Sequence, residues 1–427
     1  MKEKINILVF PDGEINSIEL HDALSTCVNI DLYGASSIER HGKYVFKKHI
    51  PNLPMLNDRL FYDHLNAVID KYNIDLIFPT HDTVTLELVR NQSNINAKIV
   101  AGDLLTVNVC RSKKETYKLF EDCDFVPKQY SIVIDSDKFP LFIKPDVGQG
   151  SVGAKKILSY DDLKNIELDE YVVTEFLSGE ECTVDCLTDK NGNLVFCSPR
   201  SRKRMMAGVC VSGKTEILTD EIKFIAATIN SRLKFLGLWY FQIKKDDVGK
   251  FKLLEISSRC AGTMCLTRAR GVNLPLLSAY VAMGYDINVM PNSYNVEMDR
   301  TLISRYVIDY EYDTVYFDFD DTLIVDSNVN LKAIWFLYQC LNNNKDVILL
   351  TKHEKELYDS MRQYRIDPNL FTEIIHILPT DSKSTYIKPD KAIFIDNAYN
   401  ERKEVEIVHH IPVFDVDNID VLMDWRC

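Results

Sequence analysis

One segment of the 427-residue sequence combines a lysine with a run of glycines. Lys144 ends the apolar stretch FPLFIK, and Gly148, Gly150 and Gly153 follow within the next turn of chain. Backbone N–H groups in such a loop can approach phosphate oxygens because no Cβ stands in the way, and the lysine adds positive charge. Taken alone, the same segment could equally be an exposed hairpin with a solvated lysine.

A second segment places two oxygen ligands opposite each other. The stretches WYFQIKK and FKLLEIS flank the turn-like KDDVGK, so a hairpin about that turn pairs Gln242 with Glu255. Ser257 shares their face because side chains alternate along a strand. Converging oxygens of this kind suit a magnesium ion that bridges nucleotide phosphates. An exposed polar strand pair would give the same pattern without a site.

A third set of residues follows apolar strands near the C-terminus. Asp318, Asp320 and Thr322 come directly after TVYF, Thr351 ends DVILLT, and Asp396 ends IFID. A parallel sheet would bring these strand ends to one edge. Several acids delivered there by buried strands are electrostatically costly unless a cation binds. The alternative is an acidic helix N-terminus stabilised by the helix dipole.

The elements that must position these residues form three regions. In the first 108 residues short apolar runs alternate with helical patterns, as in residues 60–80, which predicts a parallel sheet. The charged stretch 110–123 is predicted to be helical. The polar stretch 290–300 indicates a domain boundary between there and about residue 312. Beyond it, three buried strands within 315–323, 346–351 and 391–397 predict a small doubly wound sheet.

Composition narrows the class of protein. Hydrophobic residues make up 46% and charged residues 26%, so we expect folding throughout. Acidic residues outnumber basic ones by 63 to 50, and the net charge of −13 argues against nucleic acid or anionic lipid as partners. No apolar run is long enough to span a membrane, and the apolar start is too short for a signal peptide. We therefore expect a cytoplasmic protein without membrane or nucleic-acid partners.

Residues 1 to about 305 resemble the ATP-grasp superfamily, in particular carbamoyl-phosphate synthetase large-chain modules. The resemblance implies ATP and Mg²⁺ or Mn²⁺ as cofactors. Gln242, Glu255 and Ser257 would hold the metal, and Arg259 would be the catalytic arginine that closes the ExNPR signature. Here that signature reads EISSR, with Ser257 where asparagine is usual. The residues implied to bind ATP are Lys113, Lys144, Gly148, Gly150, Ser151, Gly153, Glu175, Phe176, Leu177 and Glu181.

ATP-grasp enzymes typically phosphorylate a carboxylate to an acyl phosphate, which an amine then attacks. Arg202 and Arg204, in the basic segment SPRSRKR, could hold the substrate carboxylate or the transferred phosphate. A solvated basic hairpin is the alternative interpretation. No motif fixes the identity of the carboxylate or the amine.

Residues 312–427 resemble the haloacid dehalogenase superfamily of Mg²⁺-dependent phosphatases. By that resemblance Asp318 is the nucleophile and Asp320 the general acid and base. Thr351 and Lys383 hold the phosphoryl oxygens, with Lys388 as the reserve for the lysine. Asp396 completes the metal site with Asp318 and the backbone carbonyl of Asp320. Only 28 residues separate Thr322 from Thr351, too few for a large inserted cap.

These interpretations predict an α/β and α+β protein with three domains. They are a pre-ATP-grasp α/β domain (1–108), an ATP-grasp domain (109–308, lid about 125–185) and a cap-less, doubly wound phosphatase domain (309–427). We expect a bifunctional enzyme that joins a small-molecule carboxylate to an amine and also hydrolyses a phosphorylated small molecule. A homo-oligomer is left open. The alternatives are a kinase or carbamoyl-phosphate-like synthetase beside the phosphatase, and a nucleotide-binding sensor or scaffold.

Overall fold

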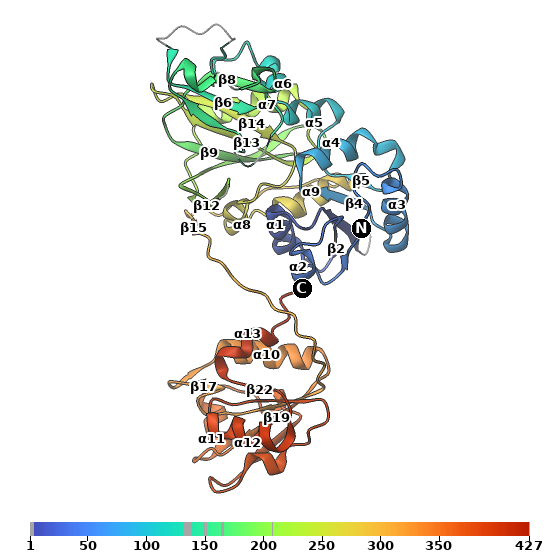
Figure 1. Ribbon diagram of the computed structural model, residues 1–427, viewed down its shortest axis with the longest axis vertical. Coiled ribbons are helices and arrows are strands. Elements are labelled where there is room, and N and C mark those ends of the chain that lie inside the picture. Colours follow the sequence, from blue (N-terminus) through green and yellow to red (C-terminus); the bar gives the residue numbers. More distant parts are fainter. Residues whose placement is uncertain are drawn as a thin grey trace. The chain divides into compact units, whose positions relative to one another are not determined.

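Two compact units make up the chain, residues 1–302 and residues 303–426 (Figure 1). The computed structural model describes residues 4–130, 138–148, 150, 152–163, 166–206 and 208–426. In Figure 1 the first unit runs from blue to yellow and the second is orange to red. The division lies close to the predicted boundary at 308/309. A further division of the first unit at 108/109 stays a prediction.

The first unit begins with a five-stranded parallel sheet in the order β3-β2-β1-β4-β5. This confirms the parallel sheet expected from the alternating pattern. Its strands are β1 (Ile5–Phe10), β2 (Ile30–Ala35), β3 (His49–Ile50), β4 (Leu76–Pro79) and β5 (Lys98–Ile99). The helices are α1 (Ile15–Leu24), α2 (Gly42–Val45), α3 (Phe61–Tyr72), α4 (Asp82–Arg90), α5 (Leu104–Arg111) and α6 (Lys113–Leu119).

Alternate side chains of β1 face two different cores, because side chains alternate across a strand. Ile7 and Val9 pack with α1 and with α9 (Leu274–Ala282). Leu8 and Phe10 pack with α3 and α4 on the other face. The buried sheet is thus covered on both sides, and its carboxyl edge presents the residues that follow β1 and β4.

The stretch 110–123, predicted to be helical, contains the end of α5 and all of α6 rather than one continuous helix. The break lies at Ser112, whose hydroxyl accepts the backbone N–H of Glu115 and so caps a new helix, α6. A serine at this position satisfies one of the free N–H groups at a helix start. The break places Lys113 at the first position of α6, beside the strand that carries Lys144.

Over the described residues, three antiparallel sheets complete the first unit. A small sheet, β7-β6-β8, carries the region predicted as the lid, and β11-β12-β15 forms another. The largest has the order β10-β9-β13-β14. Their strands are β6 (Leu141–Pro145), β7 (Lys155–Ile157), β8 (Tyr171–Glu175), β9 (Glu181–Thr188), β10 (Leu194–Ser201), β11 (Arg204–Met206), β12 (Val209–Lys214), β13 (Gly237–Lys245), β14 (Phe251–Ser257) and β15 (Glu297–Asp299).

The four-stranded sheet has an apolar and a polar face. Val184, Phe241 and Ile243 pack against α7 (Asp220–Arg232) in a buried core. Their neighbours in sequence, which include Thr183 and Gln242, line a cavity on the opposite face. Strict alternation in β9 and β13 therefore supplies both the core and the wall of a site. The short helix α8 (Cys265–Ala269) follows β14.

The second unit contains a parallel sheet in the order β20-β19-β16-β21-β22. The three predicted strands are present as β16, β19 and β21, and two further strands flank them. Its elements are β16 (Thr314–Phe317), β17 (Ile324–Val325), β18 (Asn328–Val329), α10 (Leu331–Asn342), β19 (Asp346–Thr351), α11 (Leu357–Gln363), β20 (Glu373–His376), β21 (Ala392–Ile395), α12 (Tyr399–His409), β22 (Val413–Phe414) and α13 (Ile419–Leu422).

Helices cover both faces of this sheet. One apolar core joins α10, α11 and α13 to β16 and β19, and a second joins α12 to the other face. Between Thr322 and Thr351 the chain forms only the β17–β18 hairpin, α10 and the start of β19, so no inserted cap domain is present in this fully described stretch. Across the described ranges, no helix combines the length and apolarity needed to cross a bilayer.

Candidate functional sites

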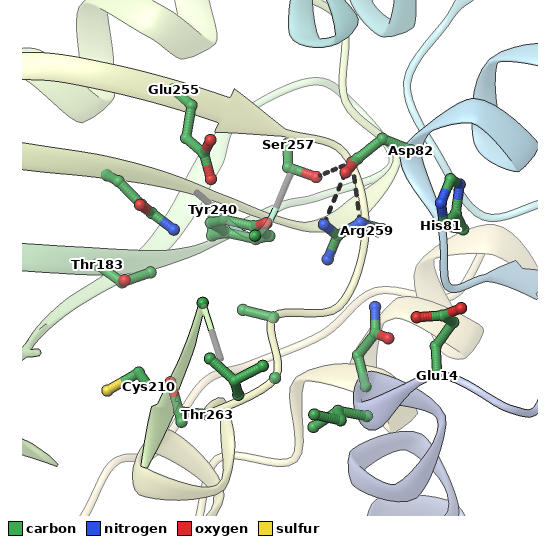
Figure 2. A pocket seen from close by; sticks show the side chains of 18 of the residues that line it. Glu14, His81, Asp82, Thr183, Cys210, Tyr240, Glu255, Ser257, Arg259 and Thr263 are labelled. Carbon is green, nitrogen blue, oxygen red and sulfur yellow. Dashed lines mark hydrogen bonds and ion pairs between the residues drawn. The ribbon is translucent and has the colours of Figure 1, made fainter. Parts of the chain in front are cut away.

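A polar cavity of about 240 Å³ lies in the first unit (Figure 2). Its walls come from the segments after β1 and β4, from the glycine loop, and from β9, β13, β14 and the loop after β14. The parallel sheet and the four-stranded sheet therefore both contribute to it. The predicted site residues that line it are Lys113, Gly148, Gly150, Arg202, Gln242, Glu255, Ser257 and Arg259.

Gln242 and Glu255 face each other directly across β13 and β14, which confirms the predicted register. Both side chains line the cavity and are only partly buried. Neither has a hydrogen-bond or ion-pair partner among the residues that the structure describes. Their oxygens are therefore available to a cation, and an amide oxygen with a carboxylate is a donor set that Mg²⁺ accepts.

The register of the hairpin shifts by one residue after this pair, at Leu254. Leu254 has no partner on β13, and its carbonyl accepts hydrogen bonds from Lys144 Nζ at 2.9 Å and from the Tyr117 hydroxyl at 3.1 Å. This β-bulge ties the strand that carries Glu255 to the strand that carries Lys144. Bulges commonly re-aim groups in this way next to functional sites.

Lys113 and Arg111, which line the cavity, and the buried Lys144, which does not line it, bond to neutral oxygens rather than to carboxylates. Lys144 bonds to Leu254, Lys113 Nζ bonds to the carbonyl of Asp146 at 3.2 Å, and Arg111 bonds to the carbonyl of Gly148 at 3.3 Å. Within the described residues none of the three has an ion-pair partner. Their uncompensated positive charge makes this end of the cavity suitable for an anion.

Lys144 is nearly fully buried. Burial, reinforced by repulsion from Lys113, lowers the pKa of Lys144 to about 7, against a smaller attraction from Glu255. Removing an ammonium group from water disfavours its charged form. An anion placed beside Lys144 would restore that charge.

Two glycines of the glycine loop have a backbone conformation that favours glycine. Gly150 and Gly153 adopt positive φ angles of 62° and 76°, which side chains with a Cβ rarely take. A Cβ at Gly153 would also come within 2.9 Å of Pro145 Cγ. The loop therefore requires glycine at both positions. Ser151, which was predicted to bind ATP, lies outside the described residues.

Arg259 forms a two-pronged ion pair with a residue that the sequence did not single out, Asp82. The Arg259 Nε and Nη2 atoms lie 2.9 and 2.7 Å from the two carboxylate oxygens, and the Ser257 hydroxyl donates to the same carboxylate at 2.8 Å. Burial raises the pKa of Asp82, but the charge of Arg259 and the hydrogen bonds from Arg259 and Ser257 together lower it to about 2. The Ser257 hydroxyl thus donates its hydrogen bond to Asp82. Its role as a metal ligand stays a prediction.

The basic segment after β10 is divided between core, cavity and surface. Arg200 is buried and bonds to both oxygens of Asp185, each at 2.9 Å, so it is held within the core, although it also borders the cavity. Arg202 lines the cavity and lies 2.7 Å from Glu181. Arg204 is half exposed, pairs with Asp299 at 2.5 Å and is absent from the cavity wall. The structure therefore does not bring Arg204 to this site, because β11 belongs to a different sheet.

The residues predicted around the adenine and ribose lie at the end of β8 and the start of β9. Glu175 accepts the backbone N–H of Lys128 at 2.8 Å, and the ammonium of Lys156 lies over the Phe176 ring. Leu177 is buried. Glu181 pairs with Arg202, as described above. None of the four lines the cavity, and their contacts with a nucleotide stay predictions.

In the second unit, one lysine joins the two predicted metal-binding aspartates. Lys383 Nζ lies 2.6 Å from Asp318 Oδ1 and 2.5 Å from Asp396 Oδ2, and all three side chains are buried. Desolvation raises the pKa of Asp318 to about 6, opposed by Lys383 and reinforced by Asp396. Burial also raises the pKa of Asp396. Lys388, the reserve for this lysine, is exposed and does not join the cluster.

Asp320 and Thr351 lie at neighbouring strand ends. Both carboxylate oxygens of Asp320 are 2.9 Å from His353 Nδ1, whose Nε2 is 2.7 Å from the Ser360 hydroxyl. The Thr351 hydroxyl is fully buried and has no hydrogen-bond partner among the described residues. An unsatisfied buried hydroxyl is unusual and suits a ligand oxygen. His353 is a contact that the sequence did not reveal.

Both candidate metal sites offer oxygen pairs rather than larger clusters. In the described part of the chain no group of three or more His, Cys, Asp or Glu side chains is arranged to hold a metal ion. Gln242 with Glu255, and Asp318 with Asp396, nevertheless have the hard oxygen donors that Mg²⁺ prefers, and water or phosphate oxygens commonly complete its shell. The residues present therefore fit this ion.

Comparisons with known proteins identify the fold of the first unit. Residues 167–304 match the model of a family described as ATP-grasp in the biosynthetic pathway with Ter operon. An N5-carboxyaminoimidazole synthetase from Staphylococcus aureus, solved with ADP, aligns with a TM-score of 0.55 and 15% identity over 68% of this chain and 79% of that one.

Two further structures agree. A biotin carboxylase from Campylobacter jejuni gives a TM-score of 0.54 and 14% identity over 66% of this chain and 71% of that one. An L-amino acid ligase from Bacillus licheniformis gives a TM-score of 0.52 and 14% identity over 66% of this chain and 75% of that one. The chain therefore contains an ATP-grasp fold, as predicted. The phosphatase prediction for residues 309–427 gains nothing from these comparisons and stays a prediction.

Proposed function

We propose that the first unit is an ATP-dependent carboxylate–amine ligase that works through an acyl phosphate. The observation that carries this proposal is the pairing of Gln242 and Glu255, whose oxygens are free, beside cations that have no carboxylate partner. Such an arrangement suits a magnesium-bound triphosphate. The structural neighbours include an L-amino acid ligase and synthetases solved with adenine nucleotides, which supports the same class.

Each group has a simple task in this proposal. Mg²⁺ held by Gln242 and Glu255 would neutralise charge on the phosphates. Lys113, Lys144 and the glycine loop would fix the phosphate chain, so that the terminal phosphoryl group faces the attacking carboxylate oxygen. Arg259 would stabilise the charge that develops during transfer. The resulting acyl phosphate is then open to attack by an amine, which releases phosphate and forms an amide.

A screen for ADP release over paired carboxylates and amines tests this function. We expect ADP release that depends on the amine, with an amide and inorganic phosphate as products by phosphorus NMR and mass spectrometry. Lys144→Ala should abolish the reaction, whereas Lys118→Ala, an exposed lysine on α6, should not. Accumulation of a phosphorylated product without any amine would instead indicate a kinase and reject ligation.

We further propose that the second unit is a phosphatase of the haloacid dehalogenase type. The supporting observation is that Asp318, Lys383 and Asp396 converge at one edge of a parallel sheet, next to the unsatisfied hydroxyl of Thr351. Asp318 would attack the phosphorus atom of a phosphomonoester and release the alcohol, and water would then hydrolyse the aspartyl phosphate. Asp320 would donate a proton to the leaving oxygen and take one from the water.

Hydrolysis of p-nitrophenyl phosphate in the presence of Mg²⁺ tests the second activity. Asp318→Asn should eliminate it, and Asp359→Asn, on the exposed side of α11, should leave it unchanged. One chain with both activities would let the phosphatase remove a phosphate from the ligated product or from its precursor. Purified protein without Mg²⁺-dependent hydrolysis of any phosphomonoester would contradict this proposal.

A further inference from the structure

Asp82 connects the parallel sheet of the first unit to the strand that carries Glu255. It is the first residue of α4, directly after β4, and its side chain reaches the end of β14. One carboxylate oxygen accepts from Ser257 and from Arg259 Nε, and the other accepts from Arg259 Nη2 (Figure 2). The contact joins positions 177 residues apart in the sequence.

The ion pair leaves Arg259 little freedom. Side-chain exposure is 14% for Arg259 and 19% for Asp82, so solvent screens the pair only weakly. Arg259 Nη1 also donates to the carbonyl of Cys260 at 3.1 Å, and the Tyr240 ring lies 5.5 Å from the guanidinium carbon. Three of its five N–H groups are therefore used within the protein, and its orientation is set before any ligand arrives.

Occupation of the Nε–Nη2 edge also limits what Arg259 can bind. Asp82 accepts hydrogen bonds from both Nε and Nη2 of Arg259, so a substrate carboxylate cannot form the same two-pronged contact with these atoms. The N–H groups left over belong to the two terminal nitrogens. Arg259 therefore keeps one N–H on each terminal nitrogen for contacts with phosphoryl oxygens.

The next residue of α4, Thr83, contacts a second arginine that lines the cavity, Arg111. The Thr83 hydroxyl accepts from Arg111 Nη2 at 3.0 Å, and Arg111 Nη1 reaches the carbonyl of Gly148 in the glycine loop. Consecutive residues of one helical turn thus orient two cavity arginines, one beside Glu255 and one beside the glycine loop.

We infer that Asp82 is a positioning residue for phosphoryl transfer, which acts through Arg259 without touching the nucleotide. This inference rests on the proposed ligase function. It assigns the parallel sheet a direct part in the transfer step, because the start of α4 holds an arginine that the four-stranded sheet carries. A residue that only positions a transition-state contact should affect kcat and leave the KM for ATP almost unchanged.

A double-mutant cycle of Asp82→Asn and Arg259→Gln tests whether the two act as one unit. We expect Asp82→Asn to lower kcat for ADP release about 10- to 100-fold, with the KM for ATP within about twofold of wild type. The double variant should be no slower than Arg259→Gln alone. Asp82→Glu, which keeps the carboxylate, should recover part of the rate, and Asp63→Asn, on the exposed side of α3, should match wild type.

The outcomes separate this inference from the proposed function. Multiplicative losses in the double variant, or a full wild-type kcat in Asp82→Asn, would overturn the positioning role alone. A wild-type protein without amine-dependent ADP release would overturn the ligase proposal and this inference with it. If the melting temperature shows that Asp82→Asn does not fold, Arg259→Lys provides the test instead. Lysine keeps the positive charge but cannot form the two-pronged contact with Asp82, so we expect kcat to fall about as far as in Arg259→Gln. A wild-type rate in Arg259→Lys would refute the inference.

Discussion

The cavity of the first unit and the acidic cluster of the second unit differ in what balances their charges. In the cavity, Glu255 and Gln242 have no described partner, and the nearby cations bond to carbonyl groups. In the cluster, Lys383 already bridges Asp318 and Asp396. The cavity can therefore bind a ligand that brings both a cation and an anion. In the cluster, the ammonium group of Lys383 already neutralises part of the carboxylate charge. A lysine should therefore serve binding in one unit and stability in the other.

The largest effects should come from removing one acid from each unit. We expect Glu255→Gln to lower kcat for ligation by about 10²–10³, because charge on the transferring group is no longer balanced. Asp318→Asn should reduce phosphatase activity to background, since the nucleophile is gone. Each variant should keep the other activity within about twofold, because each site is formed by residues of its own unit. Assays of both activities on both variants check this, and loss of both activities in a folded variant would contradict separate sites.

Replacing the bridging lysine should destabilise the second unit. In Lys383→Met the buried Asp318 and Asp396 lose their shared cation, which we expect to cost about 3–5 kcal/mol in the free energy of unfolding at neutral pH. The loss should shrink as pH falls, because burial already raises the pKa of both carboxyls and protonation removes their charge.

Denaturant titration of that unit's unfolding transition measures the effect. Lys391→Met, which removes an exposed ion pair with Asp313, is the matched control and should cost no more than about 1 kcal/mol. A cost for Lys383→Met as small as the control's would show that the bridge contributes little.

Replacing Lys144 should not destabilise its unit, in contrast to replacing Lys383. Its pKa of about 7 lies below the ordinary value of 10.5, so the folded chain binds fewer protons than the unfolded chain between these values. The unfolding free energy contributed by this group therefore rises with pH in that window, and Lys144→Met should not destabilise the first unit.

The same pKa predicts a pH dependence of nucleotide binding. A phosphate beside Lys144 favours the charged form, so binding of Mg·ADP should take up protons near pH 8 and weaken as pH rises from about 7 to 9. Calorimetry in buffers of different ionisation enthalpy measures the uptake. Lys144→Met should abolish it and Lys118→Ala should retain it. Equal uptake in wild type and Lys144→Met would assign the proton to another group.

The smallest effect should come from Ser257. Its hydroxyl gives one hydrogen bond to Asp82, which keeps two further bonds from Arg259. Loss of one such bond is worth about 0.5–1.5 kcal/mol, so we expect Ser257→Ala to lower kcat for ligation about two- to tenfold. Steady-state kinetics beside Asp82→Asn measure this. A loss larger than that of Asp82→Asn would instead favour Ser257 as a metal ligand.

The sequence predicted those parts of the sites that depend on local pairing. The register of Gln242 and Glu255 follows from a short turn between two alternating strands, and the order of Asp318, Thr351 and Asp396 follows from strands that end at one sheet edge. Such features require only neighbouring elements to be read correctly.

Contacts between distant elements could not be read from the sequence. Asp82 reaches Arg259 only because α4 and β14 are brought together by the packing of two sheets. The one signal for Asp82 was its place directly after an apolar parallel strand, where functional side chains often gather. The bulge at Leu254 and the contact of His353 with Asp320 have no signature of their own.

Short or partly exposed elements were also missed. β20 (Glu373–His376) has no buried residue, and β22 has only two residues, so neither shows the apolar run that predicted the other strands. In the basic segment 200–204 the residue types were plain, but their different positions in the fold could not be predicted. Its arginines look alike in sequence, but strand alternation and a change of sheet send them to the core, the cavity and the surface.

The most direct test of the ATP-grasp site is a titration of ADP into wild type and Glu255→Gln, each with and without Mg²⁺. We predict that Mg²⁺ strengthens ADP binding to wild type more than about tenfold, a difference of about 1.4 kcal/mol, and has little effect on Glu255→Gln. An equal effect of Mg²⁺ on both proteins would mean that the Gln242–Glu255 pair does not hold the metal, and would contradict the account.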